Sequence, residues 1–319
     1  MKKTLFAFFC FLHLFADYSI VFVHIGNNIP SHTKIAIEQA RLLNPDARII
    51  LLANGISLSL FPHFDELANI ELINYENIKI TPQHELYQKQ CSQNSPFWRY
   101  TSERFLYLWD LIDAYSLENV FHLENDNMLY ANLNFLLPTF QDKYPGIGAT
   151  FDNDDRCIAG FIWISGKNSM LPLAQYFATL ANCGLNDMQV IARYRNISLK
   201  VEIDNLPIIM KEYAEDQPMK SPHNHSTNRK DSYFNNSDEF ESIFDAAAIG
   251  QYLGGIDQIH NNNGPGFINE RCLFNPSLLS YSWKKDYNGR LIPYATFKTK
   301  EYRIINLHIH SKRLHEFKS

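Results

Sequence analysis

The chain has 319 residues, of which 45% are hydrophobic and 20% charged, and this composition excludes a generally disordered protein. Its 29 basic and 34 acidic residues give a formal net charge of −5, so it lacks the basic surface that nucleic-acid binding requires, and we expect no nucleic-acid partner. Five cysteines in 319 residues are too few for a disulfide scaffold. Their spacing does not resemble that of a zinc site.

The first sixteen residues have the pattern of a secretion signal. Lys2 and Lys3 precede an apolar run at residues 5–16 that only His13 interrupts. The run is shorter than the ~20 residues of a membrane-spanning helix, but it fits a signal-peptide core that ends in a small residue, Ala16. We expect residues 1–16 to be a signal peptide or short membrane anchor, which implies a secreted, periplasmic or membrane-associated protein. The alternative is an apolar first strand or a loose amphipathic start, in a cytoplasmic protein.

Strands and helices alternate through the rest of the chain. Strands are predicted at residues 20–25, 48–53, 70–75, 119–123, 157–165 and 302–308, and helices at 34–43, 97–115, 171–181 and 245–253. The first two strands and the helix between them form a βαβ unit, in which the strands are parallel. This order predicts an α/β fold, Rossmann-like, with helices on a mostly parallel central sheet. We expect a single domain over residues 17–319.

Residues 216–242 differ from their surroundings. Pro, His, Asn, Ser and charged residues dominate this stretch, and apolar residues are few. Such a composition predicts a mobile loop, which is a candidate lid over a binding site.

Two carboxylates directly follow the strand at 119–123, in the sequence Glu124-Asn125-Asp126. In open α/β sheets, ligands bind beyond the carboxyl ends of the strands. Carboxylates two residues apart in a turn can both reach one hard divalent cation, Mg²⁺ or Mn²⁺, which keeps open positions for phosphate oxygens. The pattern predicts a metal site. The alternative is a solvated turn, in which Asn and Asp are common.

The end of the chain carries His308, His310 and Lys312. Strand alternation places both histidines on one face, so either imidazole is a candidate ligand for the metal, while the lysine can neutralise phosphate. His308 ends the apolar strand and is therefore held more firmly. We therefore expect His308 to bind the metal. The alternative is an exposed basic terminus.

Four further residues are candidates whose ordinary roles would be structural. Arg99 and Arg104 lie five residues apart on the helix before the acidic motif, so we expect only one of them to face the site. The alternative for both is a surface arginine. Asp187 and Asp245 each open a helix, where an acidic residue also serves as a cap.

These motifs occur in an order that resembles the nucleotide-sugar glycosyltransferases of the GT-A fold, close in layout to the glycogenin-like and lipopolysaccharide-galactosyltransferase group. The resemblance covers most of residues 20–312. Its features are a buried strand ending at Gly26, an Arg-bearing helix, Glu124-Asn125-Asp126, a strand with Ala159-Gly160-Phe161, Asn186-Asp187-Met188-Gln189, and a terminal His with Lys.

The resemblance implies that the acidic motif holds Mn²⁺ (or Mg²⁺), which bridges the diphosphate of the donor. Glu124 and Asp126 match the two acidic positions, with Glu in place of the first Asp. His308 looks like the late metal-ligating histidine and Lys312 like the phosphate-contacting lysine. The terminal motif is one residue shorter here than in the family, so His310 is the alternative to His308 as the metal ligand. With His308 on the metal, His310 and Lys312 are expected to be turned toward the diphosphate.

The implied function is transfer of a sugar from a nucleoside-diphosphate sugar, expected to be a UDP-sugar, to a carbohydrate, lipid or protein acceptor. Asp187 matches an aspartate that contacts the donor sugar, and we expect it and an acceptor-facing Asp245 to be catalytic. The carboxyl ends of the first two strands are expected to bind the nucleobase, and the loop at 216–242 is expected to lie on the acceptor side. The donor-binding candidates are His24, Gly26, Asn54, Arg99, Arg104, Gly160 and Lys312.

Two other functions fit parts of the pattern. A nucleotidyltransferase would share the α/β fold and the metal, but no glycine-rich phosphate loop follows the first strand. A non-catalytic protein that binds nucleotide sugars or glycans on the same fold would lack a working metal site. Metal dependence and donor turnover separate the three.

Overall fold

The structure is a computed structural model that describes residues 16–60, 69–93, 95–197 and 203–319. The signal peptide or membrane anchor expected at residues 1–16 lies outside these ranges except for Ala16, and it stays a prediction. Across the described ranges, no helix combines the length and the apolar character needed to cross a bilayer.

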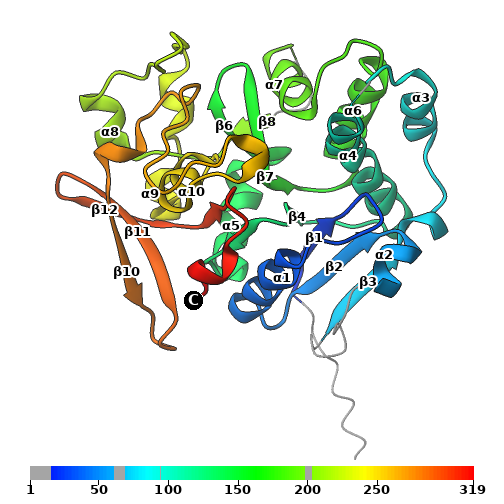
Figure 1. The fold of residues 1–319 in the computed structure, drawn as a ribbon, viewed down its shortest axis with the longest axis horizontal. Coiled ribbons are helices and arrows are strands. Elements are labelled where there is room, and N and C mark those ends of the chain that lie inside the picture. The colour runs from blue at the N-terminus through cyan, green and yellow to red at the C-terminus, as the bar shows by residue number, and fades with distance from the viewer. Residues whose placement is uncertain (1–15, 61–68, 94, 198–202) are drawn as a thin grey trace, which may run out of the picture.

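A seven-stranded sheet forms the centre of the molecule, in the order β3-β2-β1-β4-β7-β6-β8 (Figure 1). Its strands are β1 (Ser19–Val23), β2 (Arg48–Ala53), β3 (Ile70–Asn74), β4 (Val120–Leu123), β6 (Ile147–Asn153), β7 (Arg156–Ile164) and β8 (Ile203–Asn205). Neighbouring strands are parallel except where β7 is one of the pair. The predicted α/β fold with a mostly parallel sheet is confirmed.

The central strands are continuous apolar runs because both of their faces are covered. Every residue of β1 and β4 is buried. The helices are α1 (His32–Leu43), α2 (Gly55–Leu60), α3 (Pro82–Gln90), α4 (Pro96–Tyr115), α5 (Leu133–Lys143), α6 (Lys167–Thr179), α7 (Asp187–Ile197), α8 (Lys211–Asp216), α9 (Ser237–Phe240) and α10 (Ala248–Gly254). Helices α3, α4 and α6 pack on one another at the right of Figure 1.

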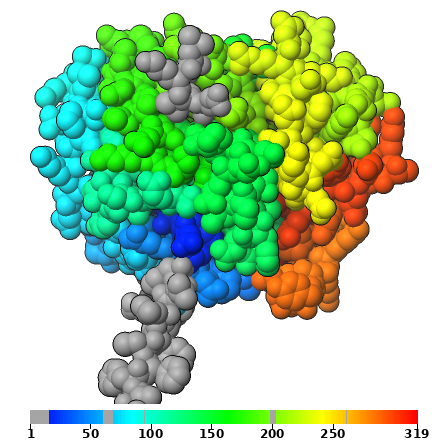
Figure 2. Space-filling view, turned by 180° about the vertical axis from the view of Figure 1, so that it is seen from behind, coloured from blue at the N-terminus to red at the C-terminus, as the bar shows by residue number. Residues whose placement is uncertain are grey.

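A second sheet has the strand order β10-β11-β12-β9. Its strands are β10 (Ser280–Lys285), β11 (Leu291–Phe297), β12 (Lys300–Ile304) and β9 (Ser242–Ile243). Seen from behind, the orange and red part of the chain, which contains β10, β11 and β12, lies at the opposite end of the molecule from the cyan segment around α3 (Figure 2).

The single strand predicted at 302–308 is in fact two strands. It ends as β12 at Ile304 and restarts as β13 (Asn306–His308), which pairs antiparallel with β5 (Asn127–Leu129). Between them, the backbone of Ile305 donates to Ile243 and accepts from Tyr130, so the chain changes sheets at this residue. The change carries His308 to the acidic motif.

Residues 216–242 contain short helical turns. Tyr233 is buried, and its hydroxyl donates to Asp154 over 2.7 Å, which packs the middle of the segment against the loop between β6 and β7. The expected mobility of this segment stays a prediction. The helix predicted to open at Asp245 begins instead at Ala248.

A buried histidine joins α3 to α4. Nδ1 of His84 lies 2.5 Å from Oδ2 of Asp110, and its Nε2 lies 3.3 Å from Oε1 of Glu103. All three side chains are buried. Burial lowers the pKa of His84, but the hydrogen bonds to Asp110 and Glu103 outweigh burial and raise it. Folding therefore stabilises the charged imidazole.

We expect the stabilisation that His84 provides to depend on pH. Because folding raises its pKa, the contribution is complete below the ordinary histidine pKa of about 6.5 and is lost as the pH rises through the raised value. His84→Gln should lower the free energy of unfolding by about 3 kcal/mol near pH 6, since it leaves buried carboxylates without their cation, and by less near pH 9. Urea unfolding at both pH values measures this.

The matched control is His315→Gln, which removes an imidazole that is 67% exposed and should leave stability unchanged at either pH. An equal loss of stability for His84→Gln at the two pH values would contradict the charged state assigned to His84.

Candidate functional site

The order of the central sheet reverses at β1. The chain passes from β1 to β2 on one side, whereas β4 pairs with β1 on the other. In an open α/β sheet, such a switch point leaves a crevice at the carboxyl ends of the two strands, where ligands bind. A cavity of about 320 Å³ lies there, lined by Val23 at the end of β1 and by Glu124 and Asp126 just after β4.

Seven residues predicted for the site line this cavity together. They come from α4, the loop after β4, the start of α7, the end of β13 and the tail that follows it. They are Arg104, Glu124, Asp126, Asp187, His308, His310 and Lys312. The fold thus brings together side chains that are distant in the sequence.

Three cations surround the two carboxylates of the acidic motif. Arg104 donates to Oε1 of Glu124 and, over 3.1 Å, to Oδ2 of Asp187. Nε2 of His308 lies 3.0 Å from Oε2 of Glu124 and 3.1 Å from Oδ1 of Asp126. The Lys312 ammonium pairs with Oδ2 of Asp126. Every oxygen of the two carboxylates therefore faces a basic group.

These contacts decide the protonation of the acidic motif. Burial by itself raises the pKa of both carboxyl groups, but Arg104 and His308 bring the pKa of Glu124 well below its usual range. His308 and Lys312 do the same for Asp126. Burial lowers the pKa of His308, yet the two carboxylates raise it to about 10. Both carboxylates are ionised at neutral pH.

Three side chains form a group that can hold a metal ion. Asp126, His308 and His310 each offer a ligand atom, and these atoms lie within 4.8 Å of one another. Burial, followed by the charge of His308, lowers the pKa of His310 to about 3, so its imidazole is neutral, as a ligand must be. His308 is protonated between its two carboxylates and would release that proton to solvent when a cation takes its place. Glu124 is not one of the three, and its oxygens pair with Arg104 and His308. Its expected role as a metal ligand stays a prediction.

A buried aspartate holds the tail in place. The Asp245 carboxylate accepts from the backbone N–H groups of Ile249 (2.9 Å) and Gly250 (2.8 Å) in α10, and from that of His308 (2.9 Å). It is fully buried and is not among the residues that line the cavity. This geometry differs from the predicted acceptor-facing role, because the carboxylate is turned to backbone amides. Asp245 positions His308.

Two glycines allow the tail to approach closely. A Cβ on Gly250 would lie 2.2 Å from the carbonyl oxygen of His308, and one on Gly160 would lie 2.6 Å from Nδ1 of the same residue. Both distances are far shorter than real Cβ contacts. Gly160, predicted to bind the donor, therefore serves to make room for the imidazole of His308 beside β7.

The two predicted arginines have different surroundings. Arg99 is 43% exposed at its side chain and lies 3.5 Å from a carboxylate oxygen of Glu103 on its own helix. Arg104 faces the cavity, as only one of the pair was expected to do. Helical geometry explains the difference. One turn takes 3.6 residues, so side chains five residues apart point in different directions from the helix axis.

The residues predicted at the ends of the first two strands brace a loop beside the cavity and do not line it. Asn54 donates to the carbonyl of Gly26 over 3.2 Å and accepts from the backbone N–H of Ser57. Nδ1 of His24 lies 3.4 Å from the side-chain nitrogen of Asn125. Asn54 thus ties the loop after β1 to the start of α2, and a nucleobase contact by these residues stays a prediction.

Aromatic and apolar side chains that were not predicted complete the cavity. They include His32 at the start of α1, Phe97 and Trp98 in the first turn of α4, and Met188 in α7. The rings of Phe97 and Trp98 have centroids 4.9 Å apart, and Phe97 is 54% exposed. The sequence contained a sign of this pair. Two large aromatic residues begin the helix, before the apolar stripe that packs on the sheet, so they were not needed for the core.

No family model and no curated protein matches the chain. Solved structures of glycosyltransferases are similar to it. The apo form of mouse xyloside xylosyltransferase 1 is 11% identical, with a TM-score of 0.47 over 63% of this chain and 90% of that one. The galactosyltransferase LgtC, in complex with donor and acceptor sugar analogs, is 16% identical, with a TM-score of 0.40 over 62% and 77%.

The same comparison includes a structure described as a glucose-1-phosphate thymidylyltransferase from Bacillus anthracis, which is 8% identical, with a TM-score of 0.35 over 59% of this chain and 87% of that one. The expected likeness to GT-A glycosyltransferases is thus found again in solved structures. The function is therefore inferred from the geometry of the site.

We expect Gly250→Ala to destabilise the protein. Helix propensity alone predicts a gain of up to about 1 kcal/mol for this change within α10. The contact with the His308 carbonyl predicts the opposite sign, a loss of about 1–3 kcal/mol, because the backbone must shift to admit the methyl group. Thermal unfolding decides between the two. Gly264→Ala is the control, since nothing lies within 4 Å of a Cβ at that position, and a stabilised Gly250→Ala variant would overturn the close approach.

Proposed function

We propose that the protein is a metal-dependent glycosyltransferase that moves a sugar from a nucleoside-diphosphate sugar to a carbohydrate, lipid or protein acceptor. The observation that carries the proposal is the meeting of Asp126, His308 and Lys312 at the switch point between β1 and β4. A carboxylate and an imidazole for a cation, together with an ammonium for phosphate, are the groups that a diphosphate donor requires.

A divalent cation fits the spacing of these ligands. Asp126, His308 and His310 would hold it, because their ligand atoms lie within 4.8 Å of one another. Carboxylate oxygens suit Mg²⁺ and Mn²⁺ alike, whereas imidazole ligation is typical of transition metals, which favours Mn²⁺. When bound, the cation stabilises negative charge on the diphosphate.

Glycosyl transfer builds up charge on the leaving group. The bond between the anomeric carbon and the diphosphate oxygen breaks, while the acceptor oxygen bonds to that carbon and gives up its proton. The nucleoside diphosphate leaves with one more negative charge. Lys312 is 34% exposed at its side chain and can turn from Asp126 to a phosphate oxygen, whereas Arg104 is fixed by two carboxylates. Fixed positive charge at this point stabilises the transition state.

The cavity also has surface that is suited to rings. Phe97, Trp98 and Met188 line it together with the charged group, so it offers both apolar and charged surface. A nucleotide sugar has the same division, since its diphosphate is anionic and its base and sugar present flat faces. We expect a uridine nucleotide as the donor, and Asp187, at the edge of the cavity, as a contact to its sugar.

The experiment is a screen of UDP-sugars for released nucleoside diphosphate, with and without Mn²⁺. We expect at least one donor to be hydrolysed slowly in the presence of Mn²⁺ and faster with a suitable acceptor. Pyrophosphate released from a nucleoside triphosphate and a sugar phosphate would show a nucleotidyltransferase instead. Metal-independent binding without any release would show a non-catalytic protein.

Asp126→Asn should reduce Mn²⁺-dependent release of nucleoside diphosphate by on the order of 100-fold or more, because the loss of one ligand removes several kcal/mol of transition-state stabilisation. The fold should survive, since the residue follows a strand end. The control is Asp142→Asn, a change in a surface carboxylate on α5 that is 71% exposed. Equal turnover in the Asp126 and Asp142 variants would contradict the metal site.

The two histidines differ in how firmly they are held, so their variants should differ. His308 is fixed by Asp245 through its backbone and by two carboxylates through its ring. We expect His308→Ala to weaken Mn²⁺ binding such that excess metal partly restores activity. Manganese titrations of His308→Ala and His310→Ala measure this, and rescue of the His310 variant alone would reverse the assignment.

A further inference from the structure

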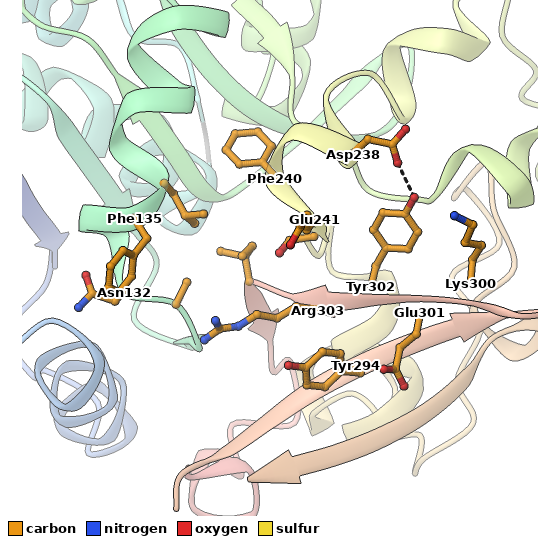
Figure 3. Close-up of a pocket in the computed structure, with 14 residues that line it drawn as sticks. Asn132, Phe135, Asp238, Phe240, Glu241, Tyr294, Lys300, Glu301, Tyr302 and Arg303 are labelled. Carbon is orange, nitrogen blue, oxygen red and sulfur yellow. Dashed lines mark hydrogen bonds between the residues drawn. The ribbon is translucent and has the colours of Figure 1, made fainter. Parts of the chain in front are cut away.

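A second and larger cavity lies outside the proposed active site. Its volume is about 620 Å³, and it is bounded by α5, the segment from α9 to β9, and strands β11 and β12. Figure 3 shows Glu241 and Arg303 near its middle, Phe135 on one side, and Tyr294 below Arg303. The cavity is large enough for a ligand of several rings.

The strand register explains why these side chains gather. Arg303 pairs with Tyr294 of β11 on one side and with Ser242 of β9 on the other. Residues directly opposite one another in neighbouring strands lie on the same face of the sheet. Tyr294 and Arg303 are therefore neighbours on one face, and Glu241 directly precedes Ser242 at its edge.

Two charged groups in this cavity have unused hydrogen-bonding capacity. Nε of Arg303 is buried and has no hydrogen-bond partner among the residues that the structure describes. Its Nη2 donates to the carbonyl of Tyr130 and so fixes the guanidinium. Glu241 is exposed, and within the same described ranges its carboxylate has no ion pair or hydrogen bond, so water is its partner and a ligand can replace that water. Its neighbour Asp238 accepts from Tyr302 over 2.6 Å. Buried donors without partners are rare, and each calls for an explanation.

The backbone at Glu241 is also unusual. Its φ is +48°, in the left-handed region that glycine and asparagine favour and that costs most other residues energy. A glycine would end α9 at this point without that cost. The glutamate at this position lines the cavity, so it adds a carboxylate where glycine would supply only the turn.

Aromatic surface borders the charged pair. Phe135, in the first turn of α5, is 76% exposed, and Tyr294 lines the cavity with the ammonium of Lys284 5.0 Å from its ring centroid. Phe135 and Tyr294 thus give the cavity two aromatic rings beside Glu241 and Arg303. Aromatic faces carry negative partial charge and attract the C–H groups of a ring laid against them.

We propose that this cavity binds a neutral carbohydrate. Sugar hydroxyls both donate and accept, so Glu241 can accept from one hydroxyl while Arg303 donates to its neighbour, and Phe135 can cover a sugar face. The charged residues that line the cavity are Asp238, Glu241, Glu301, Lys300 and Arg303. Three acidic residues against two basic ones disfavour a phosphate or nucleotide ligand.

This site goes beyond the proposed function, because it needs neither the metal nor the nucleotide. Its test therefore stands apart from the test of transfer. Saturation-transfer NMR on the full-length chain, in EDTA and without nucleotide, can use maltose, cellobiose, lactose, xylobiose, mannobiose and diacetylchitobiose as probes. We expect transfer to at least one of these sugars, and titration of that sugar gives its affinity.

Glu241→Gly should weaken binding of that sugar by at least about tenfold, which is the value of one charged hydrogen bond. The thermal midpoint should stay the same or rise, because glycine adopts the left-handed conformation freely. A merely structural role for Glu241 would lower the midpoint instead. Phe135→Ala, an exposed change, should also weaken binding, while the control Glu239→Ala on the same turn should not. The proposal is overturned if no probe shows transfer, or if the Glu241 and Phe135 variants bind as the wild type does.

Discussion

The proposed active site depends on the antiparallel pairing of β13 with β5. Its register places His308 opposite Asn127, so the imidazole lies beside the carboxylate of Asp126, far away in the sequence. Asp245 fastens the pairing from the other side through the backbone N–H of His308, and the amide of Asn306 donates to Asn127 over 3.1 Å. Buried polar contacts of this kind are strong where water is excluded, and they specify one arrangement of the chain. The rest of the site follows from this arrangement.

Charge balance is the second constraint. Two buried carboxylates beside each other would repel, and each would be costly to bury alone. Arg104, His308 and Lys312 offset this cost, but they do so in different ways. Arg104 is locked between Glu124 and Asp187, whereas Lys312 reaches Asp126 from a half-exposed tail. The site therefore combines a fixed cation with one whose side chain is partly exposed.

The parts of the fold that are local in the sequence could be predicted, and the parts that depend on distant pairing could not. The run at 48–53 is β2 over the same residues, because a buried parallel strand is a continuous apolar run. The break between β12 and β13 at Ile305 has no local signal in the sequence. It arises because the backbone of Ile305 bonds to Ile243 in one sheet and to Tyr130 beside the other. For the site, residue type and strand ends located Asp126, His308 and Lys312. They could not show that Arg104 would occupy Glu124 or that Asp245 would turn to backbone amides, because both depend on how α4 and α10 pack.

One stretch of chain connects the two cavities. Arg303 lies in the second cavity, and His308 lies in the first, five residues later, which is at most ~17 Å of extended chain. The first cavity is proposed to hold a cation where the tail meets the acidic motif. Anomalous scattering at the manganese edge, from crystals grown with Mn²⁺ and UDP, can locate that cation. We expect a manganese peak within bonding distance of both Asp126 and His308. A peak bound elsewhere, or UDP bound in this cavity with no manganese beside Asp126, would contradict it.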